Sequence, residues 1–159
     1  MDLSGRCLFP HRKGRIERKE TVDLKNYTGT YTPSFPISAR PMGEIAGYPV
    51  RPGYFEDFGA TLLPVGVNFT VHTHHGTSCE LLLFHKGEEE PYAVLPFPAS
   101  YKIGDVYSMI VFGLNIEEFE YAYRVDGPSN PREGLLFDRK KILLDPYARA
   151  VVGKHAWGE

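Results

Sequence analysis

Long helical stretches are absent from this sequence, because almost no run of helix-forming residues is free of glycine or proline. The 159 residues include 16 Gly and 13 Pro, together with 10 Tyr and 10 Phe. Glycine and proline disfavour helices, whereas aromatic residues are enriched in strands, so this composition predicts an all-β fold. A chain of this length can bury one core but is short for two, which favours a single domain and excludes a large multi-part enzyme.

The sequence is also poor in cysteine, net charge and long apolar runs. Cys7 and Cys79 are its only cysteines and lie far apart, so neither a disulfide framework nor a zinc site is indicated. The net charge of -2 gives no field that would attract nucleic acid or an anionic membrane. No segment approaches the ~18 uninterrupted apolar residues that a membrane span needs. We therefore expect a cytoplasmic protein with no nucleic-acid partner and no membrane partner.

Residues 1–57 form the least regular part of the sequence. Prolines recur there with glycines between them, and no apolar period lasts more than a few residues. Val22, Leu24, Tyr27 and Tyr31 suit a short strand or hairpin. We expect an irregular N-terminal extension that packs on the domain, because it has too few large apolar residues to offset its own ordering entropy.

Short strands are expected from residue 58 onward. The clearest is residues 119–125, where Phe119, Tyr121, Tyr123 and Val125 occupy every second position and should share one buried face. Further strands are expected at 66–72, 79–85, 92–97, 106–112 and 141–144. Roughly six to eight short strands with no amphipathic helix between them predict an immunoglobulin-like antiparallel β-sandwich.

Several motifs carry a family resemblance when they are taken in order. They are Gly66-Val67-Asn68-Phe69, Glu80-Leu81-Leu82-Leu83-Phe84, Tyr121-Ala122-Tyr123-Arg124-Val125-Asp126-Gly127-Pro128 and Leu143-Leu144-Asp145-Pro146-Tyr147-Ala148. This set resembles the N-terminal domain of bacterial glycogen debranching enzymes and isoamylases, which is carbohydrate-binding module family 48. The resemblance implies a sandwich of the early-set type over residues 58–153. In the family this domain precedes the catalytic barrel of glycoside hydrolase family 13, and residues 154–159 would begin the linker to it.

No catalytic residue is expected within this chain. Glycoside hydrolysis needs two carboxylates on opposite sides of the scissile bond, and by resemblance both would come from the barrel. The acidic residues here read as turn caps and solvated loop charges. His72, His74 and His75 are the most metal-like cluster, but no further ligand of convincing spacing completes a site, so we expect no metal and no cofactor.

The residues that bind sugar in the family are missing at their expected positions. Members that bind carry a Trp after the second core strand, a Lys directly after the equivalent of Tyr121, and a Trp just beyond the Asp-Gly turn. This chain has Ala122 and Ser129 at the last two positions and no Trp between Phe84 and Tyr101. Two other aromatic residues remain as candidates for contact with carbohydrate, Tyr107 and Trp157.

Three functions remain open from the sequence. The first is a non-catalytic accessory domain that docks on the catalytic barrel of the same polypeptide, an α-1,6-glucosidase, and shapes the access of branched α-glucan. The second is an autonomous module that targets its protein to glycogen or starch. The third is a generic immunoglobulin-like interaction domain. The missing Trp and Lys favour the first function over the second, with α-glucan bound weakly or indirectly, and the ordered motifs favour it over the third.

Overall fold

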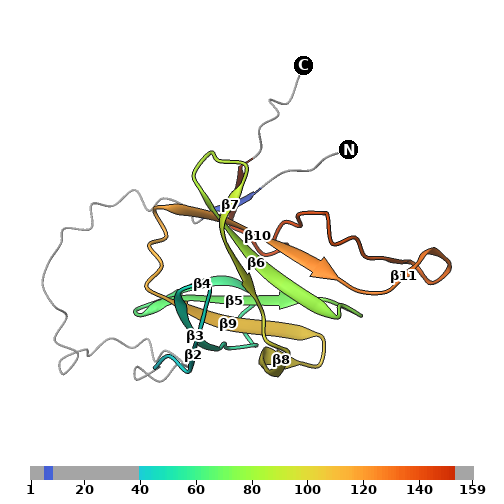
Figure 1. Ribbon diagram of the computed structural model, residues 1–159, viewed down its shortest axis with the longest axis horizontal. Coiled ribbons are helices and arrows are strands. Elements are labelled where there is room, and N and C mark those ends of the chain that lie inside the picture. The colour runs from blue at the N-terminus through green and yellow to red at the C-terminus, as the bar shows by residue number, and fades with distance from the viewer. Residues whose placement is uncertain (1–5, 9–39, 153–159) are drawn as a thin grey trace, which may run out of the picture.

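Two antiparallel β-sheets pack face to face in the computed structural model, which describes residues 6–8 and 40–152 (Figure 1). The first sheet runs in the order β13 (Ala150–Val152), β1 (Arg6–Leu8), β10 (Phe119–Asp126), β6 (Ser78–His85) and β7 (Pro91–Pro96). The second runs in the order β2 (Gly43–Ile45), β3 (Tyr48–Pro52), β9 (Val106–Phe112), β5 (Gly66–His72) and β4 (Gly59–Leu63). These sheets confirm the expected all-β, immunoglobulin-like sandwich.

The smaller elements lie at the periphery of the sandwich. They are β8 (Lys102–Ile103), which pairs with β9, a hairpin of β11 (Ser129–Asn130) and β12 (Leu135–Leu136), and the short 3-10 helices η2 (Ala99–Tyr101) and η3 (Pro131–Glu133). Within the described ranges, no helix is long and apolar enough to cross a membrane.

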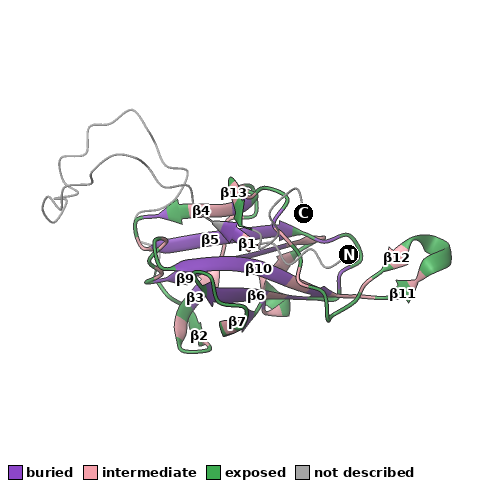
Figure 2. Cartoon of the chain, turned by 90° about the horizontal axis from the view of Figure 1, so that it is seen from above, coloured by how far each residue is buried: buried purple, intermediate pink, exposed green. Residues whose placement is uncertain are grey.

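Strand alternation places the large apolar residues between the sheets. Figure 2 shows the central strands β5, β6, β9 and β10 as buried and the β11–β12 hairpin as largely exposed. Phe119, Tyr121, Tyr123 and Val125 all lie in the core, each less than 5% exposed, as their period of two predicted. The core is therefore continuous across the β10 and β6 pair of one sheet and the β5 and β9 pair of the other.

The polar face of β5 is buried as well. Asn68 and Thr70 are fully buried, and both bind the backbone of Tyr54 in the loop after β3. The Asn68 side chain accepts a hydrogen bond from the Tyr54 amide at 2.9 Å and donates one to the Tyr54 carbonyl at 3.1 Å. Because the loop supplies these partners, the polar residues of the alternation can be buried without losing hydrogen bonds.

The prediction that residues 1–57 are irregular is wrong for three segments. β1 joins the first sheet between β13 and β10, and the β2–β3 hairpin joins the second sheet beside β9. The turn between β2 and β3 is Ala46 and Gly47, both with positive φ, which is the geometry of a tight two-residue hairpin turn. Pro49 and Pro52 explain why β3 was not predicted, since proline has no backbone N–H to donate to a neighbouring strand and normally argues against a strand. The expected hairpin near Val22 lies outside the described residues.

The expected strand at 141–144 is reduced to a single bridge. Leu143 exchanges backbone hydrogen bonds with Tyr123 of β10, at 2.9 and 2.7 Å, beside the position where Cys7 of β1 pairs with Tyr121. From there the chain passes through Asp145 and Pro146 to β13, which pairs with β1 at the edge of the first sheet. Residues 143–149 therefore form an exit segment that runs along the sandwich.

Candidate functional site

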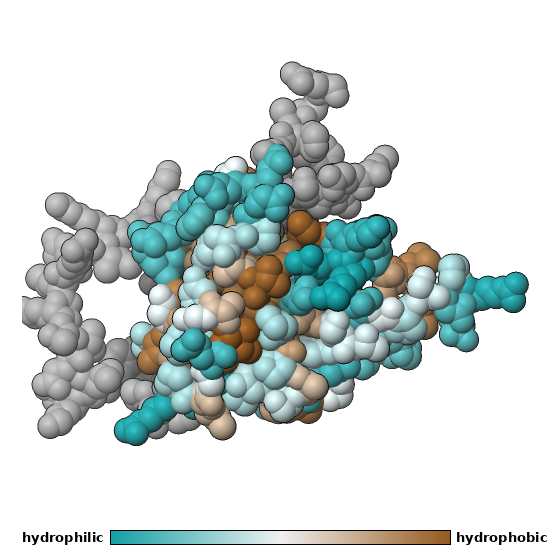
Figure 3. Space-filling model, viewed as in Figure 1, coloured by the Kyte–Doolittle hydropathy of each residue, from teal (hydrophilic) through white to brown (hydrophobic). Residues whose placement is uncertain are grey.

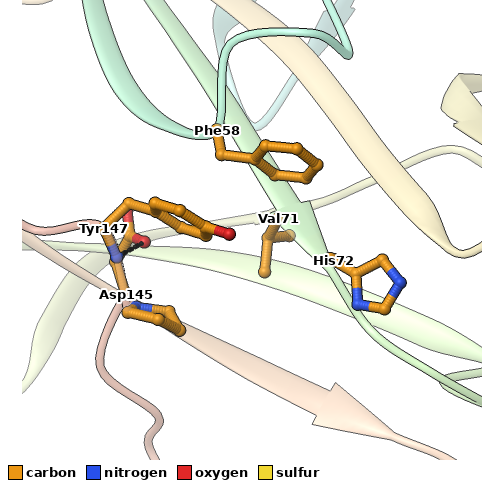
Figure 4. A pocket seen from close by; sticks show the side chains of 6 residues that line it. Phe58, Val71, His72, Asp145 and Tyr147 are labelled. Atoms are coloured by element: carbon orange, nitrogen blue, oxygen red, sulfur yellow. Dashed lines mark hydrogen bonds between the residues drawn. The ribbon is translucent and has the colours of Figure 1, made fainter.

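An open cleft of about 400 Å³ lies where the exit segment passes the ends of β4 and β5 (Figure 4). It is lined by Phe58, Val71, His72, Asp145, Pro146 and Tyr147. The rings of Phe58 and Tyr147 stack with their centroids 5.2 Å apart and an interplanar angle of 20°. Both rings are also exposed, at 39% and 57%, so the cleft presents an aromatic rim to solvent.

Asp145 fixes the floor of this cleft. Its carboxylate is 4% exposed and accepts hydrogen bonds from the Tyr121 hydroxyl at 2.9 Å and from the Tyr147 amide at 2.8 Å. The Asp145 amide in turn donates to the Cys7 sulfur at 3.2 Å. Through its carboxylate and its backbone amide, Asp145 thus ties together β1, β10 and the exit segment.

Burial shapes the ionisation of this cluster. Removal from water raises the pKa of the Asp145 carboxyl, and the hydrogen bonds from Tyr147 and Tyr121 oppose that rise in part. Burial also raises the pKa of Cys7 to about 11 and the pKa of Tyr121 well above its ordinary value. The thiol and the phenol therefore stay protonated, so Tyr121 acts as a hydrogen-bond donor and Cys7 has no nucleophilic character near neutral pH.

The backbone holds the aromatic pair in position. Gly59 follows Phe58 directly and adopts a φ of +88°, a conformation that side-chain-bearing residues rarely adopt. A Cβ atom at Gly59 would lie 2.9 Å from the Tyr147 Cβ atom. The close approach of β4 to the exit segment therefore depends on glycine, and it sets the two rings against each other.

A second surface is the outer face of the first sheet. The family resemblance leads us to expect sugar contacts there. Ala122 occupies the position of the expected Lys, and it is fully buried in a small apolar cluster with Leu82 and Phe84. Val94 and Ile142 pack against this cluster. The outer face around Ala122 is therefore occupied by the protein's own side chains.

Ion pairs surround this covered face. The Arg6 guanidinium lies over the Phe84 ring, 4.2 Å from its centroid, and pairs with Glu120 at 3.5 Å. Arg124 and Arg139 both pair with Glu80 at 2.9 Å. Glu80 and Glu120 thus both have cationic partners. They do not form a pair of acids on opposite sides of an open site, as glycoside hydrolysis requires.

The other two sugar-binding positions lack an aromatic side chain. The turn that follows β6, where the first Trp would lie, consists of exposed residues, Lys86, Gly87, Glu88, Glu89 and Glu90. Ser129 is exposed in β11, opposite Leu136. Neither position itself carries an aromatic side chain, and the nearest rings beside the first are those of His85 and Tyr92, which stack on each other with centroids 4.2 Å apart.

Of the two carbohydrate candidates from the sequence, the structure describes only Tyr107. Its ring is 2% exposed and packs in the core against Phe97, with the Lys102 ammonium 5.0 Å from its centroid. A ring buried in this way presents no open face on which a sugar could stack. Trp157 lies outside the described residues.

The three histidines do not converge as metal ligands would. His72 ends β5 at the cleft, whereas His74 pairs with Asp105 at 2.8 Å and lies tilted by 49° against the His75 ring, with ring centroids 3.8 Å apart. The hydrogen bond from His74 is the main reason that the pKa of Asp105 lies below its usual range. In the part of the chain that the structure describes, no group of three or more His, Cys, Asp or Glu could hold a metal ion.

Sequence reasoning did not identify the aromatic rim as a site. In the sequence, Phe58 is the first residue of the expected domain, and Tyr147 belongs to the last of the family motifs. The one available signal is the Asp145-Pro146-Tyr147 turn, because Pro146 cannot continue a ladder and directs the next residue away from the sheet. No sequence pattern indicates that the Tyr147 ring stacks on Phe58, 89 positions earlier; only the structure shows this contact.

The antiparallel sandwich, with its exit segment fixed by a buried aspartate, places this protein in the class of immunoglobulin-like β-sandwich modules. The chain belongs to the carbohydrate-binding module 48 family, the isoamylase N-terminal domain, which matches residues 57–148.

Curated relatives include debranching enzymes and isoamylases. A glycogen debranching enzyme of Serratia proteamaculans is 37% identical over 104 residues, which are 65% of this chain and 15% of the relative. One from Yersinia enterocolitica is 40% identical over 93 residues, 58% of this chain and 13% of the relative. The chloroplastic isoamylase SU1 of Zea mays is 34% identical over 104 residues, 63% and 13% of the two chains. The matched region thus spans about one seventh of the length of these relatives.

Proposed function

We propose that this chain is the non-catalytic N-terminal domain of a debranching enzyme that hydrolyses α-1,6-glucosidic bonds. In this role the domain docks on the catalytic barrel of the same polypeptide and shapes the access of branched α-glucan. Its membership of the family and its similarity to glycogen debranching enzymes and isoamylases support the proposal. By analogy with the bacterial relatives we also propose a cytoplasmic location, although the maize isoamylase is chloroplastic.

The covered face around Ala122 is the main reason to favour an accessory domain over a sugar-binding module. A glucan site needs open aromatic rings and polar groups that can reach the sugar hydroxyls. At the family's sugar-binding positions this chain has a buried alanine, covered by its own side chains, which include Ile142 and Arg6 of the N-terminal strand, and no tryptophan. Those features favour a domain that acts through its position on the enzyme.

The alternative, an autonomous module that targets its protein to α-glucan, is tested by direct binding. We expect the 159-residue chain to bind maltoheptaose or β-cyclodextrin with a dissociation constant weaker than about 1 mM, because without stacking anchors few contacts offset the entropy lost on association. Isothermal calorimetry measures this, and Trp157 fluorescence gives a second readout. A dissociation constant in the micromolar range would favour the targeting module, and a Trp157→Ala variant would then test the remaining aromatic candidate.

A further inference from the structure

We propose that the aromatic rim of the cleft and the outer edge of β13 form the surface on which the catalytic domain of the same polypeptide packs, an inference that rests on the proposed function. The surface consists of Phe58, Tyr147, Val151 and Val152, which we call the exit face. Its occupant would present an apolar side chain to the aromatic rim and polypeptide backbone or side chains to the edge of β13.

The exit face is apolar and exposed, and three of its four residues lie within the short stretch 147–152. Phe58 and Tyr147 are 39% and 57% exposed, and Val151 and Val152 are 53% and 39% exposed. Tyr147 lies three residues before the start of β13, and Phe58 stacks on it. Among the described residues β13 has one neighbour in its sheet, β1, and no described strand pairs with its outer edge. Exposed apolar residues on an open edge strand favour association, and native proteins normally cover such edges.

The exit face is also preformed, which lowers the cost of docking. The Tyr147 backbone is fixed by its hydrogen bond to Asp145, and Ala148 donates to the Asp145 carbonyl at 3.1 Å. Gly59 allows the contact between β4 and Tyr147, so the Phe58 ring is held against its partner. Because these groups are already ordered, they would lose little conformational entropy when a partner binds them.

The path of the chain identifies the occupant. The family is an N-terminal domain, and its relatives have most of their length outside the matched region. In such a protein the chain leaves the sandwich through the exit segment and β13, so the following domain begins beside this surface. Interfaces between domains of one chain are commonly of moderate size, about 600–1,500 Å², which suits an aromatic pair and a strand edge.

A second apolar surface lies elsewhere and fits this role less well. It is the groove beside the β11–β12 hairpin, lined in part by Leu135, Leu136 and Leu143, and Figure 3 shows hydrophobic residues over that hairpin. Leu136 is 69% exposed, but it belongs to an excursion between β10 and the exit segment and not to the path by which the chain leaves.

Hydrogen exchange of the native, longer polypeptide against the isolated 159-residue chain tests the proposal. We expect backbone amides of residues 147–152 to exchange about tenfold more slowly in the longer polypeptide, because local opening there would require the domains to separate. Tyr147→Ser and Phe58→Ser should remove this protection. Tyr92→Ser is the matched control, since Tyr92 is a 37% exposed aromatic on β7, at the opposite edge of the first sheet, and it should leave the protection unchanged.

The outcomes separate this inference from the proposed function. Equal exchange in the two proteins, with debranching activity in the longer one, would overturn the exit face and leave the proposed function standing. A native polypeptide without a catalytic domain would overturn both. Self-association of the isolated chain that Phe58→Ser abolishes would assign the surface to a second copy, and faster exchange on deletion of residues 153–159 would assign it to the chain's own end. Either result would also overturn the proposal.

Discussion

Replacing Tyr123 with alanine should lower the free energy of unfolding by about 3 kcal/mol, as large-to-small changes at buried aromatic residues do. Tyr123 is 1% exposed in the middle of β10. Its ring packs against Tyr121 and Phe97, with centroid distances of 5.9 and 6.4 Å. The substitution would leave a cavity between the sheets that β10, paired on both sides, cannot collapse to fill. Chemical denaturation of the isolated chain measures the change.

Tyr123→Phe is the control for this prediction. The Tyr123 hydroxyl is buried and has no hydrogen-bond partner among the residues that the structure describes. Removing it should therefore leave stability unchanged or raise it, because a buried polar group without a partner is destabilising. Equal free energies of unfolding for Tyr123→Ala and the wild type would show that the face of β10 that carries Tyr123 is not the core of the sandwich.

Replacing Asp145 with alanine should lower the free energy of unfolding by about 2 kcal/mol, because buried hydrogen-bond donors would lose their acceptor. The affected donors are the Tyr121 hydroxyl and the Tyr147 amide. Asp145→Asn should cost less, since its amide oxygen can still accept one of these bonds. Urea denaturation of the three proteins near neutral pH ranks them. Equal stability of the alanine variant and the wild type would show that Asp145 does not hold the exit segment.

The same residue should give stability a defined pH dependence. Burial raises the pKa of Asp145 in the folded state, so folding favours the protonated carboxyl. Its favourable contribution is complete below the ordinary Asp pKa of about 3.9 and is lost as the pH rises through the higher folded value. The stability of the wild type relative to Asp145→Asn should therefore fall as the pH rises above about 4 and through the raised pKa of the folded state. A relative stability that rises over this range would contradict the assignment.

The central strands were predictable from sequence because each one carries a local signal, either an alternation of apolar residues or, in β6, a nearly continuous apolar run. Residues 119–125 alternate strictly, and they form β10 with the expected face in the core. The strands at 43–45 and 48–52 were not predictable, because both are short and β3 contains Pro49 and Pro52. They gain their stability from pairing, β3 with β9 and β2 with β3. Strands whose stability comes from a partner distant in sequence leave little local pattern.

The sequence predicted only what the candidate site lacks, namely the family's sugar-binding residues. Ala122 and Ser129 could be compared with the family's sugar-binding residues, and the structure adds that Ala122 is buried beneath the protein's own side chains. The aromatic cleft joins Phe58, Val71 and Tyr147 from three separate parts of the chain. No local pattern links such residues, because their proximity depends on the route of the exit segment past β4.

The release of reducing ends from glycogen and pullulan tests the central claim most directly. If the proposed function is correct, a longer polypeptide that joins this chain to a catalytic domain should release reducing ends. The isolated 159-residue chain should release none above a heat-inactivated control, because the carboxylate pair for glycoside hydrolysis would lie outside this domain. Both proteins are assayed at equal molar concentration through successive purification steps. Activity that follows the 159-residue chain through purification would contradict the account, and inactivity of both proteins would contradict its assignment to a debranching enzyme.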